Sequence, residues 1–567
     1  MSATGRTLTL LLLASLAWST GYAQSAGADY HPAVASAHPL ATKAGMEILA
    51  TGGNAFDAAV ATAAVLGVVE PYSAGLGGGG FWLMQTGDGN TVFIDARETA
   101  PGRAHETLYL NDEGEIHPDQ LSVNGPLAAG IPGQPAAFAH ISETYGKTGL
   151  DANLAAAIQL ARQGFEADGH YHRMATWRRD ILARYPAAGS VFLDDGEPPE
   201  PGHLIRQPAL AKTLTTLARE GRDGFYQGDL ALKLQEDVNT AGGIWSPEDL
   251  ADYRVIEREA TRIEFGDYTL WSAPPPSSGG VALAQIFGMM SARPLEQMDT
   301  AGLSPEAARV HYLSELMRRA YRDRALYLGD PGFTDIPLER LLDSRYLADL
   351  ADTITMSRTT PSETLPGDLG SGTHTTHLSV LDGEGNRVSA TLSINLPFGS
   401  GFLSGQTGVL LNNELDDFAI KPGVPNAYGL VGGEANKVEP GKRPLSSMTP
   451  TLMSGPSGSA IIGTPGGSRI ITMVLLGLLD TMEGHSAETV VGAGRFHHQY
   501  LPDQIQHEPD ALSDSVRDEL RALGHKLADV GREYGNMQLI LVGEEGDAEA
   551  ASDPRGGGTA RVMPPPR

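Results

Sequence analysis

The chain has 567 residues, 41% of them hydrophobic and 19% charged, which is the composition of a globular protein with a large core rather than of a disordered or fibrous one. Its 41 basic and 69 acidic residues give a net charge of −28, so nucleic acids and anionic membranes would be repelled and neither is an expected partner. The absence of cysteine excludes a thiol enzyme, disulfide bonds and a lipid anchor on cysteine.

Residues 1–28 are typical of a secretory signal peptide. A basic start precedes an apolar run from Leu8 to Trp18, and small residues follow at Gly21 and Ala23. The apolar run is shorter than the roughly 20 residues that a membrane span needs, and no later segment approaches that length. We therefore expect an exported protein without a membrane anchor, located in the periplasm or secreted.

The first part of the chain changes from a helical pattern to a strand-like one and back. Residues 39–50 have the apolar spacing of a helix, and Asn54 is suited to cap a second, almost wholly apolar helix over 55–70. Strand-like residues follow over 81–101. From about 150 to 350 the pattern is mostly helical, with one interruption by a proline-rich turn.

A strand-rich part begins at Thr375 and continues in short β-type runs to about Pro465. A helical run over 469–482 and a strand over 537–543 follow. The tail from Asp553 is rich in Gly, Pro and Arg, so we expect it to be loose. Helical layers around a strand-rich centre predict a layered α/β architecture.

Gly75, Gly77 and Gly80 have the G-x-G-x-x-G spacing of dinucleotide sites. They follow a helix and precede a strand, whereas a nucleotide site needs a strand, a turn and then a helix whose N-terminus faces the phosphates. We therefore interpret the run as a tight backbone passage and not as a nucleotide site.

His374 and His377 suggest a metal pair at first sight, but three residues apart on a strand they would point to opposite faces. No HExxH or cysteine motif accompanies them. The G-x-S-x-G motif of many serine hydrolases and the GxxxxGK[ST] loop of nucleotide hydrolases are also missing. These observations therefore give no support for a metal site.

Thr375 stands at the start of the strand-like run in GSGTHTTHLSVLD, residues 370–382. A threonine hydroxyl is a weak nucleophile unless a base lies beside it, and a free α-amine on the same residue can be that base. The reference pKa of an α-amine is about 7.7 to 8.0, so part of it is neutral near pH 7. On the residues alone two interpretations stay open: an ordinary strand threonine, or a nucleophile released by cleavage of the bond before it.

Several long blocks resemble one family. From Thr375 onward these are TTHLSVLDGEGNRVSATLSIN, LLNNELDDF, KRPLSSMTPT and GTPGGSRI, in that order. Before Thr375 they are GGNAFDAAVA, SAGLGGGGF, DARETAP, PPPSSGG and ALYLGDP. Together they are similar to the small and large subunits of the γ-glutamyltranspeptidases, and the similarity runs from about residue 29 to Arg555.

The resemblance implies an α/β (α+β) protein with the four-layer αββα N-terminal-nucleophile hydrolase fold and an additional helical region in the large subunit. It also implies a precursor that cuts itself between His374 and Thr375. The large subunit would be residues 29–374 and the small subunit residues 375–567, with Thr375 as its N-terminal nucleophile.

The resemblance also implies a substrate site. Arg97 would hold the α-carboxylate of a glutamyl group and Asp417 its α-ammonium, which suits a zwitterionic amino-acid head. The Ser393 hydroxyl would contact the nucleophile at a position where family members commonly carry threonine. Further polar contacts to the substrate would come from Asn395, Glu414, Ser446 and Ser447. The backbone N–H groups of Gly466 and Gly467 would form the oxyanion hole. The loop over 422–436 would be a lid, with Tyr428 as the residue that closes it. A plain Gly/Pro surface loop is the alternative for that last segment.

The function that the resemblance implies is γ-glutamyl hydrolysis and transfer, with glutathione and related γ-glutamyl compounds as substrates. Water, amino acids or peptides would be the acceptors, and no metal or organic cofactor would be required. One alternative is a glutaryl amide acylase of the cephalosporin type on the same fold. Asp417 disfavours it, because a glutaryl group has no ammonium to pair with that carboxylate. A second alternative is an exported binding protein that does not process itself.

Overall fold

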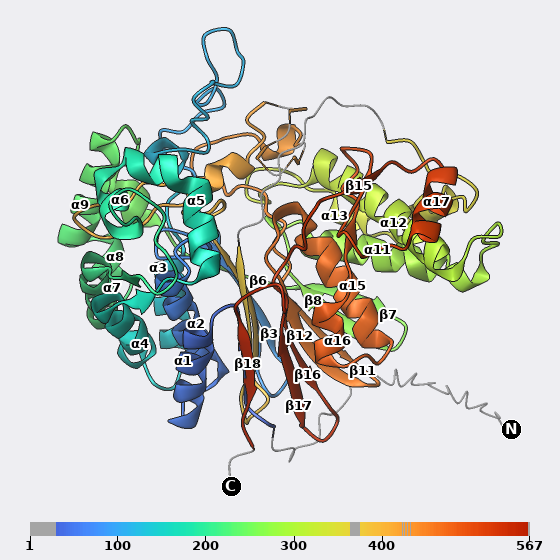
Figure 1. Ribbon diagram of the computed structural model, residues 1–567, viewed down its shortest axis with the longest axis horizontal. Helices are drawn as coiled ribbons and strands as arrows, with labels where there is room; N and C mark the ends of the chain where they lie inside the picture. Colours follow the sequence, from blue (N-terminus) through green and yellow to red (C-terminus); the bar gives the residue numbers. More distant parts are fainter. Residues whose placement is uncertain are drawn as a thin grey trace, which may run out of the picture.

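Two β-sheets face each other at the centre of the molecule, and helices cover both outer faces (Figure 1). The computed structural model describes residues 30–362 and 375–564, except for 422, 425, 428 and 431. The expected signal peptide at 1–28, His374 and Tyr428 lie outside the described residues. The four-layer αββα arrangement implied by the resemblance is confirmed.

The first sheet has seven strands in the order β18-β1-β9-β10-β2-β3-β6, and all neighbouring pairs are antiparallel. These strands are β1 (Ala33–Ser36), β2 (Gly79–Gln85), β3 (Thr91–Ala96), β6 (Ile256–Arg258), β9 (Thr376–Leu381), β10 (Arg387–Ser393) and β18 (Thr559–Val562). Strands β9 and β10, which follow Thr375, therefore lie between β1 and β2, which come from the opposite end of the chain.

The second sheet has six strands in the order β17-β16-β12-β11-β8-β7. They are β7 (Thr261–Phe265), β8 (Tyr268–Ser272), β11 (Thr451–Gly455), β12 (Gly458–Gly463), β16 (Gln538–Val542) and β17 (Ala548–Ser552). Smaller sheets pair β4 (Phe165–Glu166) with β5 (Leu204–Ile205), and join β13 (Phe496–His497), β14 (Ile505–His507) and β15 (Leu527–Asp529).

Small polar side chains connect the two large sheets. The Ser389 hydroxyl on β10 donates to the Ile462 carbonyl on β12, 3.0 Å away, and it accepts a bond from the Thr451 N–H on β11. His377 on β9 lies directly under Gly463, where a Cβ would come within 2.2 Å of the imidazole ring. The sheets approach closely there because serine and glycine occupy positions where larger side chains would hold them apart.

Helices α1 (Pro39–Ala50) and α2 (Ala55–Val69) cover the first sheet, and Asn54 closes a capping box at the start of α2. Helix α2 is buried on nearly all sides because further helices pack behind it. This outer region consists of α3 (Gln134–Thr144), α4 (Leu150–Gln163), α5 (Gly169–Arg184), α6 (Pro186–Phe192), α7 (Pro208–Glu220), α8 (Asp223–Tyr226), α9 (Gly228–Thr240) and α10 (Pro247–Asp252). It is the additional helical region that the resemblance implies.

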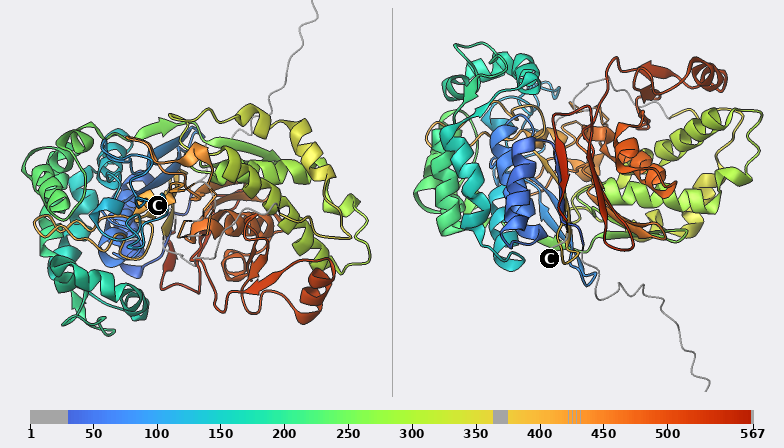
Figure 2. Two further views of the ribbon diagram at one scale, coloured as in Figure 1. Left: turned by 90° about the horizontal axis from the view of Figure 1, so that it is seen from above. Right: turned by 60° about the horizontal axis from the view of Figure 1, so that its bottom comes forward.

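Helices α11 (Gly279–Ala292) and α15 (Ile470–Met482) cover the second sheet on the opposite side of the molecule (Figure 2). Around them lie α12 (Pro305–Tyr327), α13 (Leu338–Leu341), α14 (Ser344–Asp352), α16 (Ala487–Gly492) and α17 (Asp514–Ala522). None of the helices in the described residues is both long and apolar enough to cross a membrane.

The expectation of a loose tail from Asp553 is wrong for most of that segment. Strand β18 pairs with β1 at the edge of the first sheet, with Ala33 opposite Val562 and Ser36 opposite Thr559. The backbone of β1 supplies the hydrogen bonds that hold β18, and such pairing between distant segments is not visible in local composition.

Candidate active site

Thr375 lies directly before β9, at the edge of a small cavity between the two sheets' ends. Its side chain is buried, with only 6% of its surface exposed. The empty space among its lining residues, including the part open to solvent, is about 310 Å³. Most of the residues singled out in the sequence line it: Arg97, Thr375, Ser393, Asn395, Asp417, Ser446, Ser447 and Gly467. Segments from both ends of the chain thus converge on one threonine.

Arg97 follows β3 and forms the charged centre of the cavity. Its Nη1 lies 2.6 Å from the Glu414 carboxylate, and its Nη2 lies 2.5 Å from the Asp417 carboxylate. Its Nε donates to the Pro444 carbonyl, 3.2 Å away. Burial lowers the pKa of Arg97, but the nearby carboxylates outweigh burial and the pKa is raised. The guanidinium is therefore held charged and fixed in position.

Glu98, the next residue, is wholly buried, and neither of its carboxyl oxygens has a hydrogen-bond partner in the described part of the chain. Burial, followed by the Glu414 charge, raises the pKa of Glu98 well above its ordinary value, with Arg97 acting in the opposite direction. Burial also raises the pKa of Glu414, again opposed by Arg97. Burial thus favours the neutral forms of Glu98 and Glu414, and the charge of Arg97 opposes this effect at both carboxyl groups.

Ser393 ends β10 and faces the cavity beside Asn395. The Asn395 N–H donates to the Ser393 Oγ at 2.8 Å, and the Asn395 side-chain amide donates to the Asn413 carbonyl at 2.8 Å. Asn395 has a φ of +72°, a backbone conformation that asparagine tolerates better than most residues. This turn directs the Asn395 side chain back toward the segment that carries Glu414 and Asp417.

Ser446 and Ser447 are held by the proline-rich turn that precedes α11. The Ser446 N–H donates to the Pro276 carbonyl at 2.9 Å, and the Ser278 N–H donates to the Ser446 carbonyl at 2.9 Å. The PPPSSGG and KRPLSSMTPT blocks are thus bound to each other through their backbones. A rigid frame of this kind holds the two serine hydroxyls at the cavity wall.

Gly466 and Gly467 form a sharp turn just before α15, with φ values of +150° and +56°. A Cβ at Gly466 would lie 2.3 Å from the Met473 side chain. Within the described residues, no hydrogen bond from either glycine N–H to a protein acceptor is found. Free N–H groups at the start of a helix favour negative charge, as an oxyanion hole requires.

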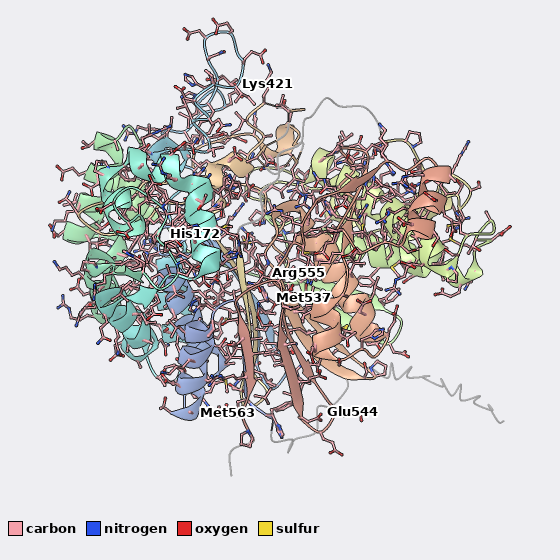
Figure 3. The ribbon with its side chains drawn as sticks, viewed as in Figure 1. His172, Lys421, Met537, Glu544, Arg555 and Met563 are labelled. Atoms are coloured by element: carbon pink, nitrogen blue, oxygen red, sulfur yellow. The ribbon has the colours of Figure 1, made fainter. Side chains whose placement is uncertain are left out.

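The loop over 422–436 lies next to the cavity, although the structure does not describe Tyr428 itself. The Asn426 side chain donates to the Asp417 Oδ1 at 3.2 Å, and the Ala427 N–H donates to the Asp416 carboxylate at 3.0 Å. Lys421, directly before this loop, lies at the upper end of the molecule (Figure 3) and pairs with Glu115 at 2.8 Å. The loop is therefore attached to Asp417 in the cavity and, through the preceding residue Lys421, to the N-terminal part of the chain.

Three buried charged residues of this region, Arg324, Glu70 and Glu98, were not singled out in the sequence. Arg324 on α12 lines the cavity, and Glu70, after α2, accepts a hydrogen bond from the Thr376 hydroxyl at 3.0 Å. Burial raises the pKa of Glu70 to about 7, and the Thr376 bond opposes this rise. Arg324 stands among several arginines of a helical run and Glu70 at a helix end, which are ordinary positions for solvent-exposed charges.

Within the described residues, one group of side chains has the composition and spacing of a metal site: His311, Glu315 and His525. The His311 Nδ1 and His525 Nε2 atoms are 2.7 Å apart in a hydrogen bond, and the His311 Nε2 faces the Thr355 carbonyl at 2.9 Å. The Glu315 carboxylate is paired with Arg319 at 2.7 Å and with Arg318 at 3.4 Å. The two histidine rings bond to each other and the Glu315 carboxylate binds two guanidinium groups, so the grouping supports a structural interpretation rather than a cation site.

Comparison with known proteins gives the family. The sequence pattern described as Gamma-glutamyltranspeptidase matches residues 41–563. The chain belongs to the γ-glutamyltranspeptidase family. Among curated γ-glutamyltranspeptidase relatives, the glutathione hydrolase proenzyme of Pseudomonas aeruginosa is 41% identical over 567 residues and covers 99% of each chain. That of Escherichia coli is 40% identical over 530 residues, which is 92% of this chain and 90% of the relative.

The fold of this γ-glutamyltranspeptidase family member is shared with an acylase. The crystal structure of a cephalosporin acylase from Bacillus halodurans superposes with a TM-score of 0.82, over 97% of this chain and 99% of that one. Its sequence identity is 26%, well below that of the glutathione hydrolase proenzymes. The N-terminal-nucleophile hydrolase fold and the assignment to the γ-glutamyltranspeptidases are therefore consistent with each other.

Proposed function

We propose that this chain is a self-processing γ-glutamyltranspeptidase that acts as a glutathione hydrolase. The observation that carries the proposal is the position of the Thr375 side chain in one cavity with Arg97 and Asp417. A glutamyl group presents a carboxylate, an ammonium and, at the end of a short chain, the carbonyl to be attacked. A fixed cation, a fixed anion and a hydroxyl nucleophile match these three features.

Maturation would begin with attack of the Thr375 Oγ on the His374 carbonyl. The bond between His374 and the Thr375 nitrogen breaks, an ester forms on Oγ, and water releases the two subunits, residues 29–374 and 375–567. The new α-amine of Thr375 then serves as the base for its own hydroxyl. The relatives named as proenzymes support this order of events.

Turnover would use the same hydroxyl. Thr375 Oγ attacks the γ-carbonyl of the donor, and the Gly466 and Gly467 N–H groups stabilise the negative oxygen of the tetrahedral intermediate. The amine leaves with a proton, and a γ-glutamyl ester remains on Thr375. Water or the amine of an amino acid or peptide then attacks this ester, which gives hydrolysis or transfer.

The glutamyl head would be held by an exchange of partners. Arg97 would turn from Asp417 to the α-carboxylate, and Asp417 would bind the α-ammonium. Asn395, Glu414, Ser446 and Ser447 would supply the remaining polar contacts, and Ser393 would contact the nucleophile. Tyr428, on the 422–436 loop, would close the site. The same loop's contact with Asp417 supports its role as a cover.

A glutaryl amide acylase is the second candidate, because the fold is shared with a cephalosporin acylase. A glutaryl group lacks the ammonium, so Asp417 would lose its partner when Arg97 turned to the substrate. We therefore favour γ-glutamyl donors. We further propose that residues 1–28 direct export.

The test uses the purified protein after incubation at neutral pH. Intact masses should reveal two fragments, the smaller one beginning at Thr375, and the protein should release glutamate from glutathione. Initial rates with γ-glutamyl-p-nitroanilide and glutaryl-p-nitroanilide then distinguish the two candidates. Faster turnover of the glutaryl compound would favour the acylase, and an uncut chain that binds γ-glutamyl compounds without consuming them would favour a binding protein.

A further inference from the structure

Arg324 is a second guanidinium in the cavity, and its surroundings differ from those of Arg97. It projects from α12, is only 5% exposed, and lines the cavity together with Thr375. Its Nε donates to the Ser278 hydroxyl at 2.9 Å and its Nη2 to the Ser447 hydroxyl at 3.2 Å. Among the described residues, no carboxylate lies within ion-pair distance of it. Asp417 in the same cavity attracts Arg324 only from beyond that distance, and burial lowers the pKa of Arg324 despite this attraction. A buried cation whose direct partners are neutral is costly unless an anion approaches it.

The two serine bonds determine where the hydroxyl hydrogens point. The Ser278 oxygen accepts from Arg324, and its own hydrogen goes to the Ser446 carbonyl, 2.8 Å away. The Ser447 oxygen also accepts from Arg324, so its hydrogen is directed elsewhere. No protein acceptor for the Ser447 hydroxyl hydrogen is found in the described part of the chain. The Ser447 hydroxyl can therefore donate a hydrogen bond to a ligand in the cavity.

The Ser446 hydroxyl is arranged in the same way. Its oxygen accepts from the Met448 N–H at 3.0 Å, which leaves its hydrogen available on the cavity side. The cavity wall thus presents two hydroxyl donors and, behind them, a guanidinium whose direct partners in the described residues are neutral. Hydroxyl donors backed by a buried positive charge favour an anion over a neutral or cationic group.

We propose that Arg324 is a specificity-determining positioning residue that makes this wall of the cavity select acyl donors bearing an α-carboxylate. It acts through Ser447, whose hydroxyl it orients, and through its own buried charge, which has no carboxylate in direct contact among the described residues. The inference rests on the proposed γ-glutamyl function, because it concerns the carboxylate of that donor. It assigns to α12 a part in substrate choice in addition to its packing against α11.

The test compares two ligands that differ only in the α-carboxylate. Dissociation constants for L-glutamate and 4-aminobutyrate are measured by calorimetry on matured wild-type protein and on Arg324→Met. The wild type should bind L-glutamate more tightly, and in Arg324→Met this preference should fall by roughly 10- to 100-fold, the usual effect of losing a hydrogen bond to a charged group. The kcat/KM ratio for γ-glutamyl- and 4-aminobutyryl-p-nitroanilide should fall by a similar factor.

Three further variants separate this role from a structural one. Arg322→Met, on the same helix but outside the cavity lining, should leave the preference unchanged. Arg324→Lys keeps the charge without the two-pronged geometry, and Ser278→Ala keeps the guanidinium but removes one of its acceptors. Arg324→Lys and Ser278→Ala should each reduce the preference for L-glutamate, but by less than Arg324→Met does. If Arg324→Met does not mature, these two variants are used for the test in its place.

Weaker binding of both ligands by the same factor would show that Arg324 only supports the fold, and would overturn the inference. The inference would also be overturned if Arg324→Met, Arg324→Lys and Ser278→Ala all kept the wild-type preference for L-glutamate. The same holds if the wild type binds L-glutamate and 4-aminobutyrate equally. A failure of the proposed function looks different: the wild type itself would not mature or would not hydrolyse γ-glutamyl-p-nitroanilide.

Discussion

Arg97 and Asp417 are bound to each other across the cavity, with 2.5 Å between Nη2 and Oδ2. Each is proposed to recognise the opposite charge of the same amino-acid head. The pair therefore keeps both charges compensated until a zwitterion enters and takes up both partners at once. A ligand with only one of the two charges would leave one member of a buried pair alone, which is unfavourable.

Asp417→Asn should therefore lower the activity toward γ-glutamyl donors more than the activity toward glutaryl donors. Loss of the carboxylate removes the partner of the ammonium, and we expect kcat/KM for γ-glutamyl-p-nitroanilide to fall roughly 10- to 100-fold. Glutaryl-p-nitroanilide, which has no ammonium, should be affected less. Asp416→Asn is the control, because Asp416 binds Ser122 and Ala427 rather than Arg97. An equal loss for both donors in Asp417→Asn would contradict the assigned role.

Thr375→Ala should remain a single chain without turnover, because both the nucleophile of maturation and that of catalysis are removed. Thr375→Ser keeps a hydroxyl and should give two fragments and measurable, reduced turnover. Intact mass spectrometry under denaturing conditions after a fixed incubation measures the first result, and release of p-nitroaniline measures the second. Cleavage before residue 375 in the alanine variant would show that another group cuts the chain.

Gly463→Ala tests the close contact between the sheets. A Cβ there would lie 2.2 Å from the buried His377 ring, and the imidazole has little room to move because it also bonds Thr391 at 2.8 Å. We expect a loss of about 1–3 kcal/mol in the free energy of unfolding, measured by urea titration. Gly492→Ala is the matched control, since that glycine is exposed and its Cβ would meet nothing within 4 Å. Equal stabilities would mean that the sheets separate more easily than this packing implies.

Glu70 should make stability depend on pH. Its pKa is raised by burial from 4.5 to about 7, so the folded protein binds this proton more tightly than the unfolded chain does. Its contribution to stability is therefore complete below pH 4.5 and is lost as the pH rises through 7. Compared with Glu70→Gln, the free energy of unfolding should fall by roughly 3 kcal/mol between pH 4.5 and 7.5.

The pH experiment is done in the Thr375→Ala background, so that a single chain unfolds in urea. The difference between the protein that keeps Glu70 and its Glu70→Gln variant, rather than either curve alone, reports on this carboxyl group. A difference that does not change with pH would mean that Glu70 titrates normally in the folded protein.

Local sequence patterns were sufficient to predict the position of several helices and strands. The helix predicted over 39–50 is α1, with the same bounds, and the capping residue Asn54 starts α2 as expected. The strand over 537–543 is β16, Gln538–Val542. Amphipathic spacing, caps and short β-type runs are properties of neighbouring residues, and they survive in the folded protein when tertiary packing agrees with them.

Features that depend on distant partners could not be predicted in the same way. Arg97 and Asp417 were singled out through their blocks, but their direct bond joins positions 320 residues apart. Arg324, Glu70 and Glu98 have no local pattern that distinguishes them from exposed charges, because their burial results from elements elsewhere in the chain. The pairing of β18 with β1 likewise follows from topology alone.

The order of the strands has a consequence for the lifetime of the protein. With β9 and β10 inserted between β1 and β2, and β11 paired with β8, a cut before Thr375 would leave two polypeptides that run through the same sheets. They could separate only by complete unfolding, and they could then recover only by meeting again, at a rate set by dilution. The uncut precursor would refold alone at any concentration. Maturation would thereby make unfolding irreversible in practice, and the lifetime of this protein, which has no disulfide bonds, would be set by its rate of unfolding.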